Sequence, residues 1–179
     1  MYESEIAKAL KTTKKVWFAV APRVNRANEK RQKWSWFSEM PERKLYIADD
    51  NFEFAEYLMT VARRLGWTVQ TCSNGNELLA LLRSGKGAAV VLVDINMPEK
   101  DGIEVIEGLS EVSRPLRFRF MTGGADAPML AAKLMARARN LSVGRNLYKP
   151  IPMDTLKLVL VDEWDALMKL EKAPDLPVE

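Results

Sequence analysis

Charged and hydroxyl side chains stand at the end of each of several apolar runs in the sequence. These are Asp49 and Asp50 after "LYIA" (45–48), Asp94 after "AAVVLV" (88–93), Thr122 at the end of "LRFRFMT" (116–122) and Lys149 after "NLY" (146–148). A carboxylate at the end of a buried strand is unfavourable unless a partner compensates for its lost hydration. Three carboxylates that share one site favour a bound cation, and Mg²⁺ prefers oxygen ligands. A lysine and a hydroxyl on the other side are suited to phosphoryl oxygens.

The apolar runs alternate with segments of helical periodicity from Leu45 onward. The sequence predicts strands at 45–48, 67–72, 88–93, 116–122 and 146–148, and helices at 52–65, 74–85, 102–111, about 127–139 and 153–170. Parallel strands need crossover helices, so five βα units predict a doubly wound α/β fold. Such sheets bind ligands at the carboxyl ends of their strands, which is where the charged groups fall. The run 88–93 has the unbroken apolar character of a strand buried on both faces, whereas alternating arginines predict that 116–122 is less buried.

The charge of the chain is unevenly distributed. Residues 1–44 carry 11 Lys and Arg against 5 Asp and Glu, whereas the remaining residues carry 16 against 19. This break near Met40–Pro41 predicts three parts: a basic helical N-terminal extension at 1–43, an α/β domain at 44–170 and a flexible C-terminal tail at 171–179.

The composition excludes several kinds of chemistry. The 179 residues include no histidine, which rules out Ser-His-Asp and Cys-His catalysis, the usual zinc sites and a phosphohistidine carrier within this chain. Cys72 is the only cysteine, so no internal disulfide can form. No apolar stretch is long enough for a membrane span, and the N-terminus has no obvious secretory signal. These features predict a cytoplasmic protein.

Four short motifs occur in the order and at the strand ends found in the receiver domain of two-component response regulators. They are "ADD" (48–50), "DINMPEKDG" (94–102), "MTGG" (121–124) and "YKP" (148–150). On these motifs residues 44 to about 170 resemble this CheY-like family. The resemblance implies a flavodoxin-like (βα)5 three-layer sandwich whose five-stranded parallel sheet has the order 2-1-3-4-5.

The resemblance also implies a role for each strand-end residue. Asp94 would accept a phosphoryl group from a histidine kinase or phosphotransfer protein, with Thr122 and Lys149 contacting that group. Mg²⁺ would be held by Asp49, Asp50, Asp94 and the backbone carbonyl of Asn96. Lys149–Pro150 would be a cis peptide bond.

Simpler interpretations exist for these residues when each is taken alone. Asp49–Asp50 is also typical of a helix cap, Thr122 could likewise be a cap, and Lys149 could be a solvated surface lysine. An aspartate after a buried strand also occurs in phosphatases of the haloacid dehalogenase type. Those enzymes need a second acid two residues later, where this chain has Asn96.

Two features depart from the receiver pattern. The aromatic residue expected three positions before the lysine is Asn146, and strand alternation would place Asn146 and Tyr148 on one face. The run "LAAKLMARARNLSVGRNLYKP" more weakly resembles receivers that precede EAL-type cyclic-di-GMP phosphodiesterase domains. The chain could therefore be the receiver fragment of such an enzyme.

Partners of the chain are left open by the sequence. The basic extension, which contains Trp17, Trp34 and Trp36, could dock on its own domain or on a second subunit, act as a linker, or touch an acidic partner. A homodimer could form through this extension or through the face of helix four, strand five and helix five. No nucleic-acid-binding signature is evident. The expected function is a phosphorylation-driven switch, and the alternative is a docking or dimerisation domain that works unphosphorylated.

Overall fold

The protein is described from a computed structural model, which covers residues 41–109, 112–124 and 126–171. The predicted helical extension and the tail at 172–179 lie outside these residues, apart from 41–43 at the end of the extension. The chain divides into two units after Met40, and the described residues all belong to the unit that begins at Pro41. No helix within the described residues is long and apolar enough to cross a membrane.

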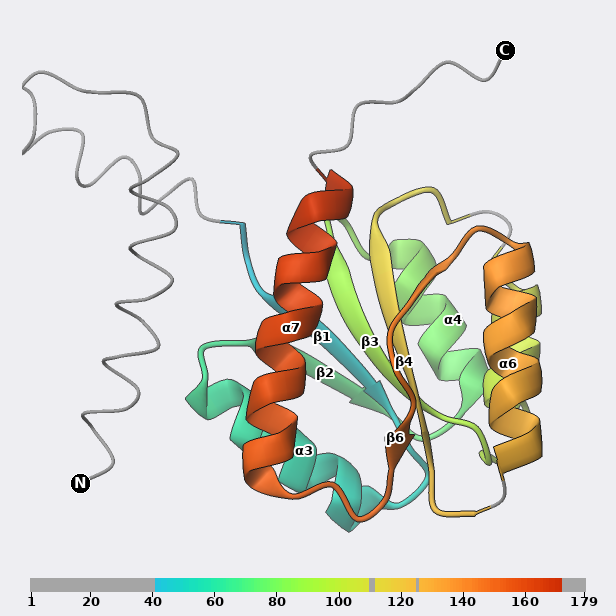
Figure 1. Ribbon diagram of the computed structural model, residues 1–179, viewed down its shortest axis with the longest axis horizontal. Helices are drawn as coiled ribbons and strands as arrows, with labels where there is room; N and C mark the ends of the chain where they lie inside the picture. Colours follow the sequence, from blue (N-terminus) through green and yellow to red (C-terminus); the bar gives the residue numbers. More distant parts are fainter. Residues whose placement is uncertain (1–40, 110–111, 125, 172–179) are drawn as a thin grey trace, which may run out of the picture. The chain divides into compact units, whose positions relative to one another are not determined.

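A parallel sheet forms the centre of this unit (Figure 1). Its strands are β1 (Lys44–Ala48), β2 (Thr68–Cys72), β3 (Ala89–Asp94), β4 (Leu116–Thr122), β5 (Ser142–Val143) and β6 (Leu147–Tyr148). Their order is β2-β1-β3-β4-β5, with β6 also paired to β4. The predicted doubly wound fold and the 2-1-3-4-5 order are therefore confirmed. All six residues of β3 are buried, as its unbroken apolar run predicts.

Within the described residues, five helices cover the two faces of the sheet and create two hydrophobic cores. They are α3 (Phe52–Arg64), α4 (Gly75–Ser84), α5 (Gly102–Glu107), α6 (Asp126–Ala138) and α7 (Met153–Glu171). The helices α3 and α7 pack on one face, and α4, α5 and α6 pack on the other. On the first face the rings of Trp67 and Trp164 meet edge to face, 5.6 Å apart between centroids. The sheet therefore holds its strand ends between two packed layers of helices.

Side-chain caps fix where the helices nearest the strand ends begin. Asn51 and Asn74 accept hydrogen bonds from the backbone N–H groups of Phe54 and Glu77 at the starts of α3 and α4. Asp101 forms a capping box with Glu104 at the start of α5. The loops that follow β1, β2 and β3 consequently have defined lengths and directions.

The strand β4 is less buried than β3, as predicted, but only slightly. Arg117 is half-buried, whereas Arg119 is only 6% exposed although it is charged. Both guanidinium groups pair with Glu163 of α7, which is itself 2% exposed. The difference from β3 is small because an ion pair supplied by a distant helix offsets the cost of burying these charges.

The fifth position of the sheet consists of two short strands where the sequence predicted one at 146–148. Phe118 of β4 pairs with Val143, and Met121 of β4 pairs with Leu147. Between these pairs β4 advances three residues while the opposite segment advances four, so that segment contains one extra residue. The interruption covers 144–146. Asn146 therefore precedes the strand, and alternation does not place it on one face with Tyr148.

The helix α5 is also shorter than predicted. It ends at Glu107, whereas the sequence suggested a helix over 102–111, of which residues 110–111 are outside the described part of the chain.

Candidate functional site

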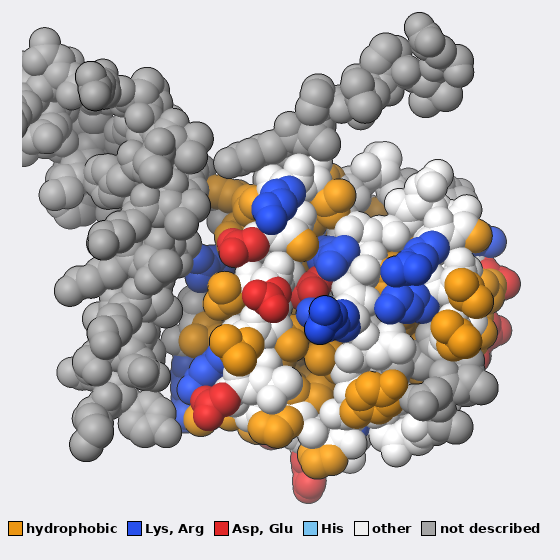
Figure 2. All heavy atoms as spheres, viewed as in Figure 1, with side chains coloured by type: hydrophobic (Ala, Val, Ile, Leu, Met, Phe, Trp, Pro, Cys, Tyr) orange, Lys and Arg blue, Asp and Glu red, His pale blue; other side chains and the backbone are white. Residues whose placement is uncertain are grey.

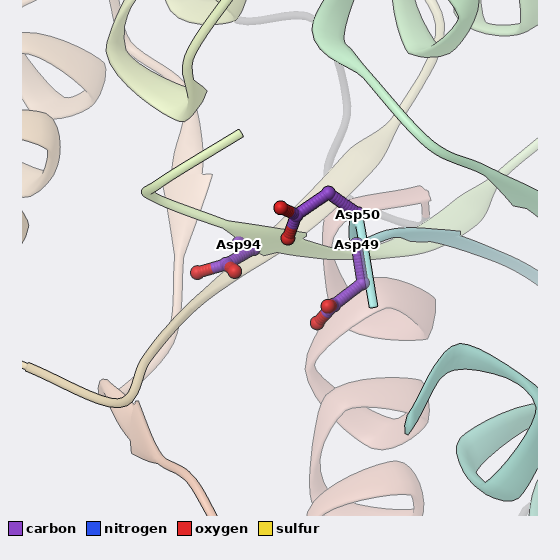
Figure 3. A group of neighbouring side chains, drawn as sticks. All are labelled: Asp49, Asp50 and Asp94. Atoms are coloured by element: carbon purple, nitrogen blue, oxygen red, sulfur yellow. The ribbon is translucent and has the colours of Figure 1, made fainter. Parts of the chain in front are cut away.

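Three carboxylates lie together at the carboxyl edge of the sheet (Figure 3). Asp49 and Asp50 follow β1, and Asp94 is the last residue of the neighbouring strand β3. One oxygen from each of the three lies within 4.8 Å of the others. Asp49 and Asp94 are 2% and 5% exposed, while Asp50 is exposed. The parallel pairing of β1 with β3 brings these residues together as predicted.

Lys149 closes the other side of this acidic group. Its Nζ lies 2.6 Å from Oδ2 of Asp94 and 2.7 Å from Oδ2 of Asp49, and its side chain is 19% exposed. The ammonium group also lies 5.0 Å from the centroid of the Phe54 ring on α3. Phe54 is not among the site residues predicted from the sequence, because apolar residues at helical spacing indicate only an apolar helix face.

Burial and ion pairing act in opposite directions on these groups. Burial raises the pKa of Asp49 above its ordinary value of 3.8, although the bond to Lys149 opposes this shift. Burial alone would lower the pKa of Lys149, but the hydrogen bonds to Asp49 and Asp94 outweigh it and raise that pKa above 10.5. Lys149 is therefore fully charged at neutral pH, and it partly neutralises the site.

Thr122 and Asn96 lie at the same edge of the sheet as the acids, after or at the ends of β4 and β3. Thr122, at the end of β4, is 1% exposed, and its Oγ1 accepts a hydrogen bond from the Gly124 N–H at 3.1 Å. The Asn96 N–H donates to Oδ1 of Asp94 at 3.3 Å. The Lys149 N–H donates to the Thr122 carbonyl at 2.8 Å, which ties the lysine backbone to the strand that carries the hydroxyl. The Lys149–Pro150 bond is cis, as predicted.

The simpler interpretations of these residues are wrong. Asn51 is the N-cap of α3, while Oδ1 of Asp49 accepts a hydrogen bond from the Asn51 N–H. Thr122 lies four residues before α6 begins and does not cap it. Lys149 is held by two buried carboxylates and is not a solvated surface lysine.

Comparison with known proteins identifies the family. Residues 45–160 match the response regulator receiver domain. The chain belongs to this family. It is a receiver domain of the two-component type, a phosphoacceptor domain and not a classical enzyme, so the phosphatase interpretation is set aside.

Individual relatives agree with this assignment. The transcriptional regulatory protein CpxR homolog of Haemophilus influenzae is 29% identical over 116 residues, which cover 65% of this chain and 47% of that protein. The transcriptional regulatory protein TctD of Salmonella typhimurium is 31% identical over 115 residues, which cover 64% of this chain and 48% of that protein. The receiver thus spans about half the length of these curated relatives.

Solved structures show the same fold. A CheY-like receiver domain protein from Methanospirillum hungatei superposes with a TM-score of 0.62 at 18% identity, over 73% of this chain and 99% of that one. A structure described as adenylate cyclase from Rhodopirellula baltica gives a TM-score of 0.56 at 27% identity, over 74% and 96% of the two chains. None of these matches supports the weaker resemblance to receivers that precede EAL domains.

Proposed function

We propose that this receiver accepts a phosphoryl group on Asp94 and changes the partner-binding surface of the domain in response. The observation that carries the proposal is the position of Asp94, whose Oδ2 lies 2.6 Å from Lys149 and whose neighbours are two further carboxylates. In-line phosphoryl transfer depends mostly on positioning and on neutralisation of charge, and this edge of the sheet offers both.

The chemistry can be written for the residues present. An Asp94 carboxylate oxygen attacks the phosphorus of a phosphohistidine, a P–O bond forms, and the P–N bond breaks with release of the imidazole. The Lys149 ammonium group pairs with the phosphoryl oxygens, and the Thr122 hydroxyl donates a hydrogen bond to them. The product is an acyl phosphate on Asp94.

A magnesium ion fits the donor set at this site. Asp49, Asp50 and Asp94 present carboxylate oxygens within 4.8 Å of one another, and hard oxygen ligands are those Mg²⁺ prefers. These three residues and the Asn96 carbonyl would hold it. When bound, it would supply positive charge that neutralises the transferring phosphoryl group.

The phosphoryl donor and the output partner must be other molecules or other segments. The 179 residues contain no histidine, so a histidine kinase or phosphotransfer protein would supply the group.

For output, the surface of α6, β6 and α7 exposes apolar side chains among charged ones (Figure 2). These are Leu130 and Leu134 of α6, Tyr148 of β6, and Leu158 and Val161 of α7. We propose this surface for an output partner or a second copy.

Intact-mass measurement after incubation with acetyl phosphate tests the proposal. We expect the gain of one phosphoryl group in the presence of Mg²⁺, and no gain with EDTA or in Asp94→Asn. Asp165→Asn, an exposed carboxylate on α7, is the matched control and should gain the group as the unaltered chain does.

A chain that binds Mg²⁺ but gains no phosphoryl group would contradict the proposal. The unphosphorylated docking domain would then be the better description.

A further inference from the structure

The extra residue in the fifth position of the sheet forms a bulge that leads directly to Lys149. On one side of it the Gly144 N–H donates to the Phe118 carbonyl at 2.9 Å, and on the other the Lys149 N–H donates to the Thr122 carbonyl at 2.8 Å. Residues 145 and 146 do not join this ladder. Bulges beside functional sites commonly re-aim a side chain, so what holds this one matters for Lys149.

Arg119 of β4 spans the interruption. Its Nη1 donates to the Arg145 carbonyl at 2.6 Å, and its Nε donates to Oε1 of Glu163, also at 2.6 Å. The planar guanidinium group therefore binds the bulged backbone and α7 at the same time. Both Arg119 and Glu163 are buried, so the bond between them is shielded from water, whereas the bond to the Arg145 carbonyl is partly buried.

Gly144 leaves room for this arrangement. A Cβ atom at this position would lie 2.4 Å from Nε of Arg119 and 2.6 Å from Oε1 of Glu163. A larger residue at this position would therefore require Arg119 and Glu163 to shift.

Arg117 makes a similar but separate set of contacts. Its Nε donates to Oε2 of Glu163, and its Nη1 donates to the Ser142 hydroxyl at 2.8 Å, before the interruption begins. It therefore shares the partner and the strand of Arg119 without touching the bulged backbone.

We infer that Arg119 and Glu163 are positioning residues for Lys149: together they hold the bulge at 144–146 and so set the register of Lys149 against Thr122. The role of Lys149 toward a phosphoryl group rests on the proposed function, whereas its register does not. The receiver lacks an aromatic residue at position 146, and this buried ion pair occupies the junction of β4, the bulge and α7.

Amide hydrogen exchange in the full chain, followed by NMR, tests the inference. In Arg119→Met we expect protection of the Lys149 amide to fall about tenfold or more, because its segment opens locally. The Asp49 amide, which donates to the Cys72 carbonyl across the sheet, should keep its protection. Arg117→Met is the matched control, because each of the two substitutions leaves one arginine paired with Glu163. Arg117→Met should leave the Lys149 amide protected.

Two further variants separate charge from geometry. Arg119→Lys keeps a positive charge but lacks the second arm that reaches Arg145, so it should lose protection at Lys149 as Arg119→Met does. Gly144→Ala keeps every charged group, but its added Cβ should also lower the protection of the Lys149 amide. Three results would each overturn the inference. The first is an equal loss of amide protection at Lys149 and Asp49, and the second is unchanged protection of the Lys149 amide in Arg119→Met. The third is a Lys149 amide that stays protected in Arg119→Lys.

Phosphorylation kinetics give the second measurement. If Arg119 acts through Lys149, the single substitution Arg119→Met should slow the Mg²⁺-dependent phosphorylation of the chain by acetyl phosphate. In a Lys149→Ala background it should change the rate by less than about twofold. A full additional loss in that background would overturn the inference. Absence of labelling in the unaltered chain would instead contradict the proposed function, and hydrogen exchange would still decide whether Arg119 positions Lys149.

Discussion

At the residue scale, Lys149 offsets the negative charge of two buried carboxylates at once. Replacing it with methionine leaves Asp49 and Asp94 without their cation, and removal of one partner from a buried ion pair costs roughly 3 kcal/mol. We expect Lys149→Met to lower the free energy of unfolding by about this amount in urea at pH 7 with EDTA. Mg²⁺ should recover more stability in the variant than in the unaltered chain.

Lys157→Met provides the control, since Lys157 pairs with the exposed Asp154 on the same helix. Its effect should stay within about 0.5 kcal/mol. A loss in Lys149→Met no greater than this would show that the acidic site does not depend on the lysine.

Cys72 offers a second prediction at the residue scale. Burial raises the pKa of its thiol to about 12, and the thiol donates to the Ile47 carbonyl. Because the thiolate is the reactive form, the folded chain should react with a disulfide reagent at pH 8 far more slowly than the urea-unfolded chain. Equal rates in the two states would contradict the burial of this residue.

At the element scale, the loop from Asp94 to α5 allows no added bulk at Gly102. A Cβ there would lie 2.7 Å from the Asp94 carbonyl oxygen, which is backbone and cannot move aside easily. Gly102→Ala should therefore cost about 1–3 kcal/mol of stability in denaturant and slow phosphorylation of Asp94. Gly123→Ala is the matched control, because its Cβ would meet only the Lys149 Cβ at 3.9 Å. Equal effects of the two substitutions would be inconsistent with the crowding.

The elements also show where sequence reasoning succeeded and where it failed. The strand ends that carry Asp49, Asp94, Thr122 and Lys149 could be predicted because parallel pairing places them at one edge. The burial of Arg119 could not be predicted, because its partner Glu163 lies 44 residues away in the sequence. The bulge could not be predicted either, because register depends on pairing between distant segments and not on the local pattern.

At the scale of the whole molecule, residues 41–179 contain both hydrophobic cores and every residue proposed for the site. We expect this fragment to fold alone with one cooperative transition in urea. Circular dichroism and the fluorescence of the buried Trp67 and Trp164 should follow the same curve. Separate transitions, or none, would contradict the predicted boundary between the extension and the receiver.

The added residue at 144–146 also has a consequence for the comparison of homologous positions. Against a relative whose segment pairs with its β4 without interruption, an alignment anchored at Ser142 and one anchored at Lys149 would differ by one residue. Asn146 is the counterpart of the family's aromatic residue only when positions are counted back from the lysine. Substitution patterns gathered across relatives of this chain should therefore be read separately on the two sides of residues 144–146.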